Sequence, residues 1–158
     1  MSGLWLSGGT SLRRMEILIK ALSPDATIPT YANEGDAGCD LVASEDVTLA
    51  AGGGRAMVPT GVAIALPEGH AGFVLPRSGL SSKHGVTCIN APGLIDSGYR
   101  GELKVAMVNH DPELHYEIKK GDRVAQLVVL PVPAAHFVVV EDLPDTSRGG
   151  AGFGSSGR

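Results

Sequence analysis

Two polar segments of the sequence contain residue types that could act on a phosphorylated ligand. The first, residues 76–82, combines Arg77 with serine hydroxyls, including that of Ser78, and with the flexible Gly79. Hydroxyl and backbone N–H groups at the start of a helix donate hydrogen bonds to phosphate, and an arginine contacts two of its oxygens at once. A serine here is also an ordinary helix cap, so this segment alone does not decide between a phosphate site and a cap.

The second segment, residues 90–101, carries a carboxylate between two turns. The Pro-Gly pair at 92–93 and the Ser-Gly pair at 97–98 predict tight turns, and Asp96 lies between them, close to Tyr99. An aspartate in a loop can accept a proton as a general base or can bind a metal ion. It can equally be a local hydrogen-bond cap, because aspartate is common in turns.

The glycine-rich C-terminal residues 148–157 are typical of an anion cradle. Glycines let the backbone approach a phosphate closely, Ser155 and Ser156 add donors, and the Phe153 ring could stack on a base. The spacing of a Walker loop is absent, which excludes an ordinary P-loop. The composition alone favours a disordered terminus that carries no site.

Bulk composition narrows the possible partners. The chain has 158 residues, enough for one domain, and a formal net charge of −4. This charge gives no reason to expect nonspecific binding of nucleic acid, so local groups must hold any phosphate. No apolar run is long enough to span a membrane. Cys39 and Cys88 lack metal-ligand spacing, and we expect two small buried thiols, as suits a reducing compartment.

Short apolar runs rich in valine and isoleucine must position these segments, and they predict an all-β domain. Turns rich in glycine and proline separate the runs, as in a barrel, sandwich or jelly roll. Leu103, Val105 and Met107 should share one face of a strand, whereas residues 124–130 and 137–140 are almost continuously apolar, as strands buried on both faces would be. Residues 78–84 are expected to form one or two helical turns, with little helix elsewhere.

The sequence predicts three parts along the chain. In residues 1–14 the arginines follow a short apolar stretch, which is the wrong order for a secretory signal. We expect these residues to be a disordered N-terminal extension. Met15 is a candidate for the natural beginning. Residues 15–143 should form the β domain, and residues 144–158 a flexible tail rich in glycine and serine that is too poor in apolar residues to fold alone.

Taken in order, five segments resemble those of the trimeric dUTPase family (deoxyuridine triphosphate nucleotidohydrolases) of the bacterial type. They are residues 37–41, 76–80, 90–101, 121–127 and 148–157, and the resemblance extends from Met15 to Gly157. Any one segment could arise by chance, but five in this order and spacing are a specific signal. The resemblance implies a jelly-roll-like β-clip subunit that assembles as a homotrimer, with active sites between subunits and the tail closing over a neighbour's site.

The resemblance also implies the reaction and its residues. Asp96 matches the catalytic carboxylate that takes a proton from water, which attacks the α-phosphorus of dUTP and releases dUMP and pyrophosphate. The backbone of residues 93–96 matches the uracil pocket, where Leu94 replaces an often smaller or polar residue, and Tyr99 matches the aromatic that excludes a 2′-hydroxyl. The substrate contacts implied are Arg77, Ser78, Gly79, Asn90, Gly93, Leu94, Ile95, Asp96, Tyr99, Lys104, Gln126, Arg148, Phe153, Gly154, Ser155 and Ser156.

A metal and a cellular role come from the same resemblance. Mg²⁺ is implied, held by the substrate phosphates and by water, with Asp40 matching a carboxylate that holds such water. The enzyme would keep uracil out of DNA and supply dUMP for thymidylate synthesis. It would act in the cytoplasm, with dUTP as its small-molecule substrate, copies of itself as its only partners, and no nucleic acid or membrane.

Three other interpretations fit parts of the sequence. A dCTP deaminase would share the fold, but it needs a catalytic glutamate in the third segment and no arginine–glycine tail; ammonia release from dCTP would identify it. A noncatalytic nucleotide-sensing protein on this scaffold would be expected to lose Asp96 or the tail, and the sequence keeps both. A structural β domain with an unrelated tail does not account for five matching segments.

Overall fold

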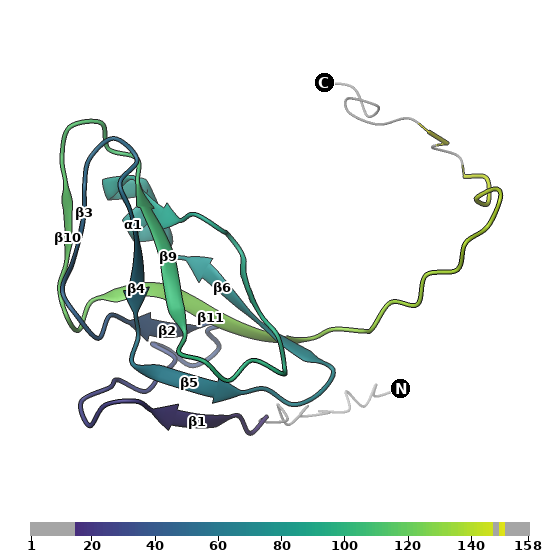
Figure 1. Ribbon diagram of the computed structural model, residues 1–158, viewed down its shortest axis with the longest axis horizontal. Coiled ribbons are helices and arrows are strands. Elements are labelled where there is room, and N and C mark those ends of the chain that lie inside the picture. Colours follow the sequence, from purple (N-terminus) through teal and green to yellow (C-terminus); the bar gives the residue numbers. More distant parts are fainter. Residues whose placement is uncertain (1–14, 147–148, 151–158) are drawn as a thin grey trace, which may run out of the picture.

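The structure is a computed structural model that describes residues 15–146 and 149–150 of the chain. Within these residues it contains eleven strands and one short helix (Figure 1). The strands are β1 (Leu18–Ala21), β2 (Cys39–Val42), β3 (Val47–Leu49), β4 (Arg55–Pro59), β5 (Val62–Ala65), β6 (His70–Pro76), β7 (Val86–Cys88), β8 (Gly93–Ile95), β9 (Lys104–Asn109), β10 (Tyr116–Ile118) and β11 (Arg123–Pro131), and the helix is α1 (Ser78–His84). No described helix is long and apolar enough to cross a bilayer. The predicted all-β, jelly-roll-like fold with little helix is confirmed.

The strands pair antiparallel in four small sheets. One sheet has the order β2-β11-β6-β8, a second has the order β4-β9-β7, and the pairs β1-β5 and β3-β10 complete the set. Strand β11 is central, because it pairs with β2 on one side and with β6 on the other. Most neighbouring strands are therefore distant in sequence, and the site segments are brought together by these long-range pairings.

A single hydrophobic core lies between the sheets. Leu103, Val105 and Met107 are each 1% exposed, while Lys104 faces solvent, so the predicted alternation along this strand is confirmed. Val108 is buried as well, although the alternation assigned it to the opposite face. Burying each such side chain contributes about 1.5–3 kcal/mol. This core fixes the strand from which Lys104 projects.

Helix α1 begins and ends where the sequence predicted. Arg77 precedes it with an extended backbone, and Gly85 ends it in the left-handed conformation, at φ 64°. The Gly85 N–H donates to the carbonyls of Leu80 and Ser81, and glycine adopts this conformation without steric cost. Because β6 ends at Pro76, the helix places Ser78 directly beyond the end of a central strand.

Both cysteines are free thiols. Cys88 is 4% exposed, as expected, whereas Cys39 is only half-buried and donates to the Leu127 carbonyl at 3.4 Å. Desolvation raises the pKa of Cys39 and raises that of Cys88 to about 11. The expectation of two buried thiols is thus confirmed for Cys88 and only partly met by Cys39.

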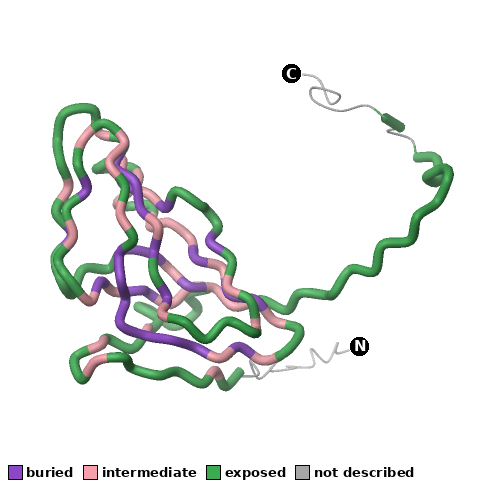
Figure 2. The backbone as a smooth tube through the Cα atoms, in the orientation of Figure 1, coloured by how far each residue is buried: buried purple, intermediate pink, exposed green. Residues whose placement is uncertain are grey.

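The prediction of a buried strand at residues 137–140 is wrong. Beyond Pro131 the chain leaves the domain and runs outward, exposed along its described length (Figures 1 and 2). Phe137 is 89% exposed and Val139 is 98% exposed. Pro131 and Pro133 lack the N–H that a ladder requires, so pairing with β6 ends there. The other predicted buried strand, residues 124–130, lies within β11. It is buried near its start but exposed at its end, at Leu130.

Candidate active site

The segment 90–101 is held in place by β8, which it contains. Strand β8 pairs with β6, with Gly93 opposite Val74. A Cβ on Gly93 would lie 3.3 Å from Val74 Cβ and from Asn90 Nδ2, so glycine permits this close approach. Gly93 therefore begins a strand and does not form the predicted tight turn, which lies earlier, at residues 89–90. The second predicted turn is present, closed by the Tyr99 N–H donating to the Asp96 carbonyl at 3.0 Å.

An open cavity of about 590 Å³ lies beside this segment. Its walls combine two carboxylates, an ammonium group, a phenol and apolar side chains. Five of its seven lining residues were predicted as site residues from the sequence. The seven are Met57, Leu94, Ile95, Asp96, Tyr99, Glu102 and Lys104.

The Tyr99 ring is seated on the backbone of the same loop. Its hydroxyl donates to the Glu102 carbonyl at 3.0 Å. A Cβ on Gly101 would lie 2.7 Å from Tyr99 Cζ and closer still to the hydroxyl oxygen. Because an ordinary carbon–carbon contact is about 3.5–4.0 Å, only glycine at position 101 allows this ring position.

The Glu102 side chain bridges the cavity wall and a neighbouring turn. One carboxylate oxygen accepts from the Gly61 N–H at 2.9 Å, and the other lies 3.4 Å from Lys104 Nζ. Lys104 is about half exposed, whereas the Glu102 side chain is 22% exposed. The ammonium group is thus paired with a carboxylate that is itself anchored to the backbone.

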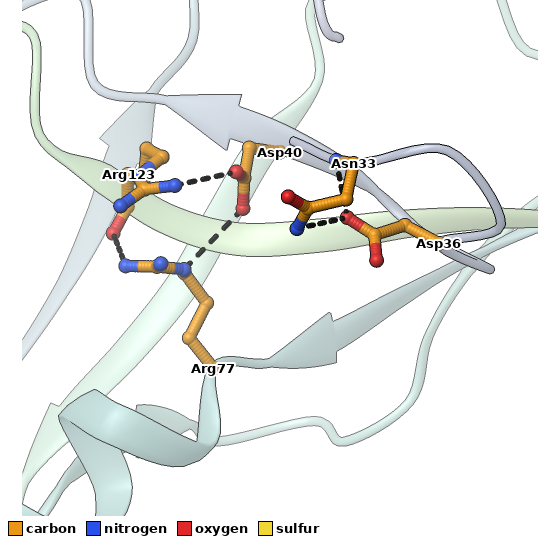
Figure 3. A network of polar contacts seen from close by, with 5 residues as sticks. All are labelled: Asn33, Asp36, Asp40, Arg77 and Arg123. Carbon is orange, nitrogen blue, oxygen red and sulfur yellow. Dashed lines mark hydrogen bonds and ion pairs between the residues drawn. The ribbon is translucent and has the colours of Figure 1, made fainter. Parts of the chain in front are cut away.

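A second polar cluster lies where β6 meets α1 (Figure 3). Asp40, on β2, is 6% exposed and faces two guanidinium groups, with Arg77 Nε at 3.3 Å and Arg123 Nη1 at 3.1 Å. Arg77 also donates to the Arg123 carbonyl at 3.1 Å. Gln126 is opposite Asp40 in the β11–β2 register, and Ser78 is exposed at the start of α1. The cluster presents cations and hydroxyl donors in one region.

The predicted site residues thus fall into separate groups within the described chain. Leu94, Ile95, Asp96, Tyr99 and Lys104 line the first cavity. Arg77 lines a different cavity, of about 270 Å³, that includes Arg123 and Tyr116. Asn90 contacts Gly93, which precedes the cavity residue Leu94 in sequence. Gly79 follows Ser78 on α1. Arg148, Phe153, Gly154, Ser155 and Ser156 lie outside the described residues.

Sequence reasoning missed Met57 and Glu102. Glu102 and Lys104 are two residues apart in an extended segment, so their side chains should share one face, and this spacing could have indicated the pair. Met57 comes from β4, which is distant in sequence. Nothing local to Met57 could have indicated its place in the cavity.

The described residues offer no ready-made metal cage. They contain no group of three or more His, Cys, Asp or Glu side chains that could hold an ion. The buried Asp40 carboxylate faces two arginines, and one of its oxygens, Oδ1, makes no hydrogen bond of good geometry there. Among these residues only the Asp40 carboxylate could contact metal-bound water, so an Mg²⁺ ion here would depend on phosphate oxygens and water for its coordination.

Comparison with known proteins gives consistent matches. The dUTPase family model matches residues 24–157. A deoxyuridine 5'-triphosphate nucleotidohydrolase of Leifsonia xyli subsp. xyli is 61% identical over 130 residues, which are 82% of this chain and 85% of that protein. One from Thermobifida fusca is 54% identical over 143 residues, covering 90% of this chain and 79% of that protein.

Solved structures of phage proteins share the fold. The dUTPase of Staphylococcus bacteriophage 80alpha, solved with dUPNHPP, superposes with a TM-score of 0.83 at 33% identity, covering 90% of this chain and 99% of that one. A variant of the dUTPase from phage phi11 of S. aureus, described with a structural Mg(II) ion, gives a TM-score of 0.76 at 28% identity, with coverages of 83% and 100%.

Proposed function

Because the chain belongs to the dUTPase family and is a dUTP diphosphatase, we propose that Asp96 is the general base of its reaction. Its carboxylate accepts a proton from a water molecule as the water oxygen bonds to the α-phosphorus of dUTP. The bond from that phosphorus to the bridging oxygen of the leaving group breaks, giving dUMP and pyrophosphate. The observation that carries this assignment is the exposed position of Asp96 in the cavity shared with Tyr99 and Lys104.

Base recognition is assigned to the backbone of β8 and to Asn90. Strand β8 is at the edge of its four-stranded sheet as described, so its outward N–H and C=O groups have no partner strand among the described residues. An edge strand can hydrogen-bond a ligand as it would another strand. Peptide groups of Gly93, Leu94 and Ile95 can read the edge of uracil and reject cytosine, whose donor and acceptor pattern is reversed. A tight pocket also excludes the 5-methyl group of thymine.

Sugar recognition is assigned to Tyr99. Its ring is fixed by the hydrogen bond to the Glu102 carbonyl and by contact with Gly101. A fixed ring under the deoxyribose leaves no space for a 2′-hydroxyl, so UTP is refused. Lys104, on the same wall, adds a positive charge toward the substrate.

The phosphates are assigned to the second cluster and to the tail. Arg77, Ser78, Gly79 and Gln126 supply a cation and polar groups near the end of β6. Arg148, Gly154, Ser155 and Ser156 are proposed to hold the terminal phosphates, with Phe153 stacking on the base. Mg²⁺, when bound to the triphosphate, neutralises charge that builds on the leaving pyrophosphate. Asp40 is retained as a candidate for holding metal-bound water.

Assembly as a homotrimer with shared sites is part of the proposal. Two observations support it. The first cavity, lined by Asp96 and Tyr99 and here called the base-and-sugar cavity, is separate from the cavity that Arg77 lines in the same chain. A neighbouring copy could therefore complete each site. The apolar residues Phe137 and Val139 are almost fully exposed, as is typical of a surface that a partner covers. Cytoplasmic action, removal of dUTP before it enters DNA and supply of dUMP for thymidylate synthesis complete the proposed role.

The test combines substrate choice with one substitution. The protein is given dUTP, dCTP, dTTP or UTP with Mg²⁺, and pyrophosphate release is measured; only dUTP is expected to be split. The variant D96N should lose at least about 100-fold in turnover while still binding dUTP, because proton transfer is lost and the ligand contacts remain. As a control, E68Q changes an exposed acid in the β5–β6 turn and should turn over normally. Normal turnover by D96N would remove Asp96 from the proposed role.

A further inference from the structure

Glu102 is the most constrained charged residue of the base-and-sugar cavity. Its side chain and the backbone of the next residue, Leu103, are joined to the turn between β4 and β5 and to the start of β5 by three hydrogen bonds. The Gly61 N–H donates to the Glu102 carboxylate at 2.9 Å, the Leu103 N–H donates to the Val62 carbonyl at 2.8 Å, and the buried Thr60 hydroxyl donates to the Leu103 carbonyl at 2.6 Å. This network holds the start of β9 against the turn.

The turn that receives Glu102 is itself fixed. Gly61 has a left-handed backbone, at φ 70°, and a Cβ there would lie 3.2 Å from the Cβ atoms of Ala26 and Ser44. Its carbonyl accepts from the Leu22 N–H at 2.8 Å. The Gly61 N–H therefore points at Glu102 from a position with little freedom to move.

We propose that Glu102 is a positioning residue that holds the Lys104 ammonium group at the cavity wall. The inference rests on the proposed function, in which Lys104 faces the substrate. Glu102 uses one carboxylate oxygen for the Gly61 N–H and the other for Lys104, at 3.4 Å. It does not touch the reacting atoms in this role and acts through Lys104.

The anchored carboxylate distinguishes this pair from an ordinary surface ion pair. In an exposed pair both long side chains must be ordered, and the net gain is small. Here the carboxylate is already ordered by Gly61, so Lys104 alone is restrained. Without Glu102, substrate binding would have to order Lys104 as well, which corresponds to roughly a 2- to 10-fold weaker interaction.

The direction in which KM changes when Glu102 is neutralised separates a positioning role from simple repulsion of the substrate. Glu102 is negative and lines the cavity into which a triphosphate is proposed to bind. If its charge acted only by repelling the substrate, its neutralisation would lower KM. Positioning of Lys104 predicts the opposite, a rise in KM with kcat nearly unchanged.

The experiment is a double-mutant cycle measured by pyrophosphate release. The variant E102Q keeps an oxygen to accept from Gly61 but loses the charge that attracts Lys104. KM for dUTP is expected to rise roughly 2- to 10-fold in E102Q and to change less than about 2-fold when the same substitution is made in K104M, since pairwise coupling appears only when both partners are present. The control E117Q removes the exposed Glu117–Lys119 pair, 3.0 Å apart. Glu117 lies on β10, which pairs with β3, and neither residue lines the cavity, so KM should be unchanged.

Each other outcome is decisive. An unchanged or lowered KM in E102Q overturns the proposal, and so does an equal rise in the K104M background, because Glu102 would then act independently of Lys104. Thermal unfolding of E102Q, compared with that of the parent, shows whether the fold is intact. If K104M turned over dUTP with the same KM as the parent, the proposed role of Lys104 would fail. If K104M were impaired and E102Q were not, the role of Lys104 would stand and only that of Glu102 would fail.

Discussion

Replacing Gly101 by alanine tests whether the position of the Tyr99 ring determines the preference for dUTP over UTP. Gly101 does not have a left-handed backbone, so alanine itself is tolerated and the effect is confined to the added methyl group. That methyl carbon would lie 2.7 Å from Tyr99 Cζ and 3.1 Å from Cε2. The ring must therefore move by about 1 Å to reach an ordinary contact distance.

The size of the effect follows from what the ring loses. The hydrogen bond from the Tyr99 hydroxyl to the Glu102 carbonyl, now 3.0 Å, is broken, at a cost of about 0.5–1.5 kcal/mol. A shift of about 1 Å in a positioning group can cost on the order of 100-fold in rate. We expect kcat/KM for dUTP to fall between about 2-fold and 100-fold in G101A. The ratio of kcat/KM for dUTP over UTP should fall as well, because the displaced ring no longer fills the space beside the 2′ position.

The assay is pyrophosphate release from dUTP and from UTP, with two reference variants. In G98A, within the same loop, the added Cβ meets no atom within 4 Å, so both rates should match those of the parent. In Y99F only the hydroxyl is lost and the ring stays over Gly101, so selectivity should be largely kept. An unaltered dUTP-to-UTP ratio in G101A, or an equal loss in G98A, would refute the reasoning.

Three further predictions concern the rest of the chain. In D40N the partly exposed guanidinium groups of Arg77 and Arg123 lose their charged partner, and urea unfolding should show a loss of about 1–3 kcal/mol; no loss would mean that the cluster does not stabilise the fold. Truncation after Leu143 should leave the circular dichroism spectrum unchanged and cut turnover severely, whereas a fully active truncate would contradict the role of the tail. Burial raises the pKa of Cys88 to about 11, so the thiol stays neutral in the folded chain while that of the unfolded chain ionises near 9. Thermal stability should therefore fall as pH rises from 9 toward 11, and fall less in C88A; equal slopes would exclude this cause.

Local features of the chain were predictable because local physics determines them. Residues 78–84 form α1 because a polar start and a glycine able to adopt the left-handed conformation enclose them. Alternation predicts the inward Val105 and Met107 of β9, but not the burial of Val108. The pairing of β8 with β6 was not predictable in this way, because a three-residue strand carries no sign of its partner.

Other features could not be read from the chain by pattern. Residues 137–140 have the apolar composition of a buried strand. Composition does not tell whether such a run packs inside its own domain or lies outside it. Met57 enters the cavity only because β4 lies beside β9. The division of the site residues between two cavities is likewise a property of the folded arrangement.

If the proposed assembly covers the outward-running segment after Pro131, the stability of one chain depends on the concentration of the others. Phe137 and Val139 stay in water on an isolated chain, and any copy that covers them gains free energy from their burial. Under the proposed assembly, mass action links folding to protein concentration, so the polypeptide would be more stable in a concentrated sample than in a dilute one.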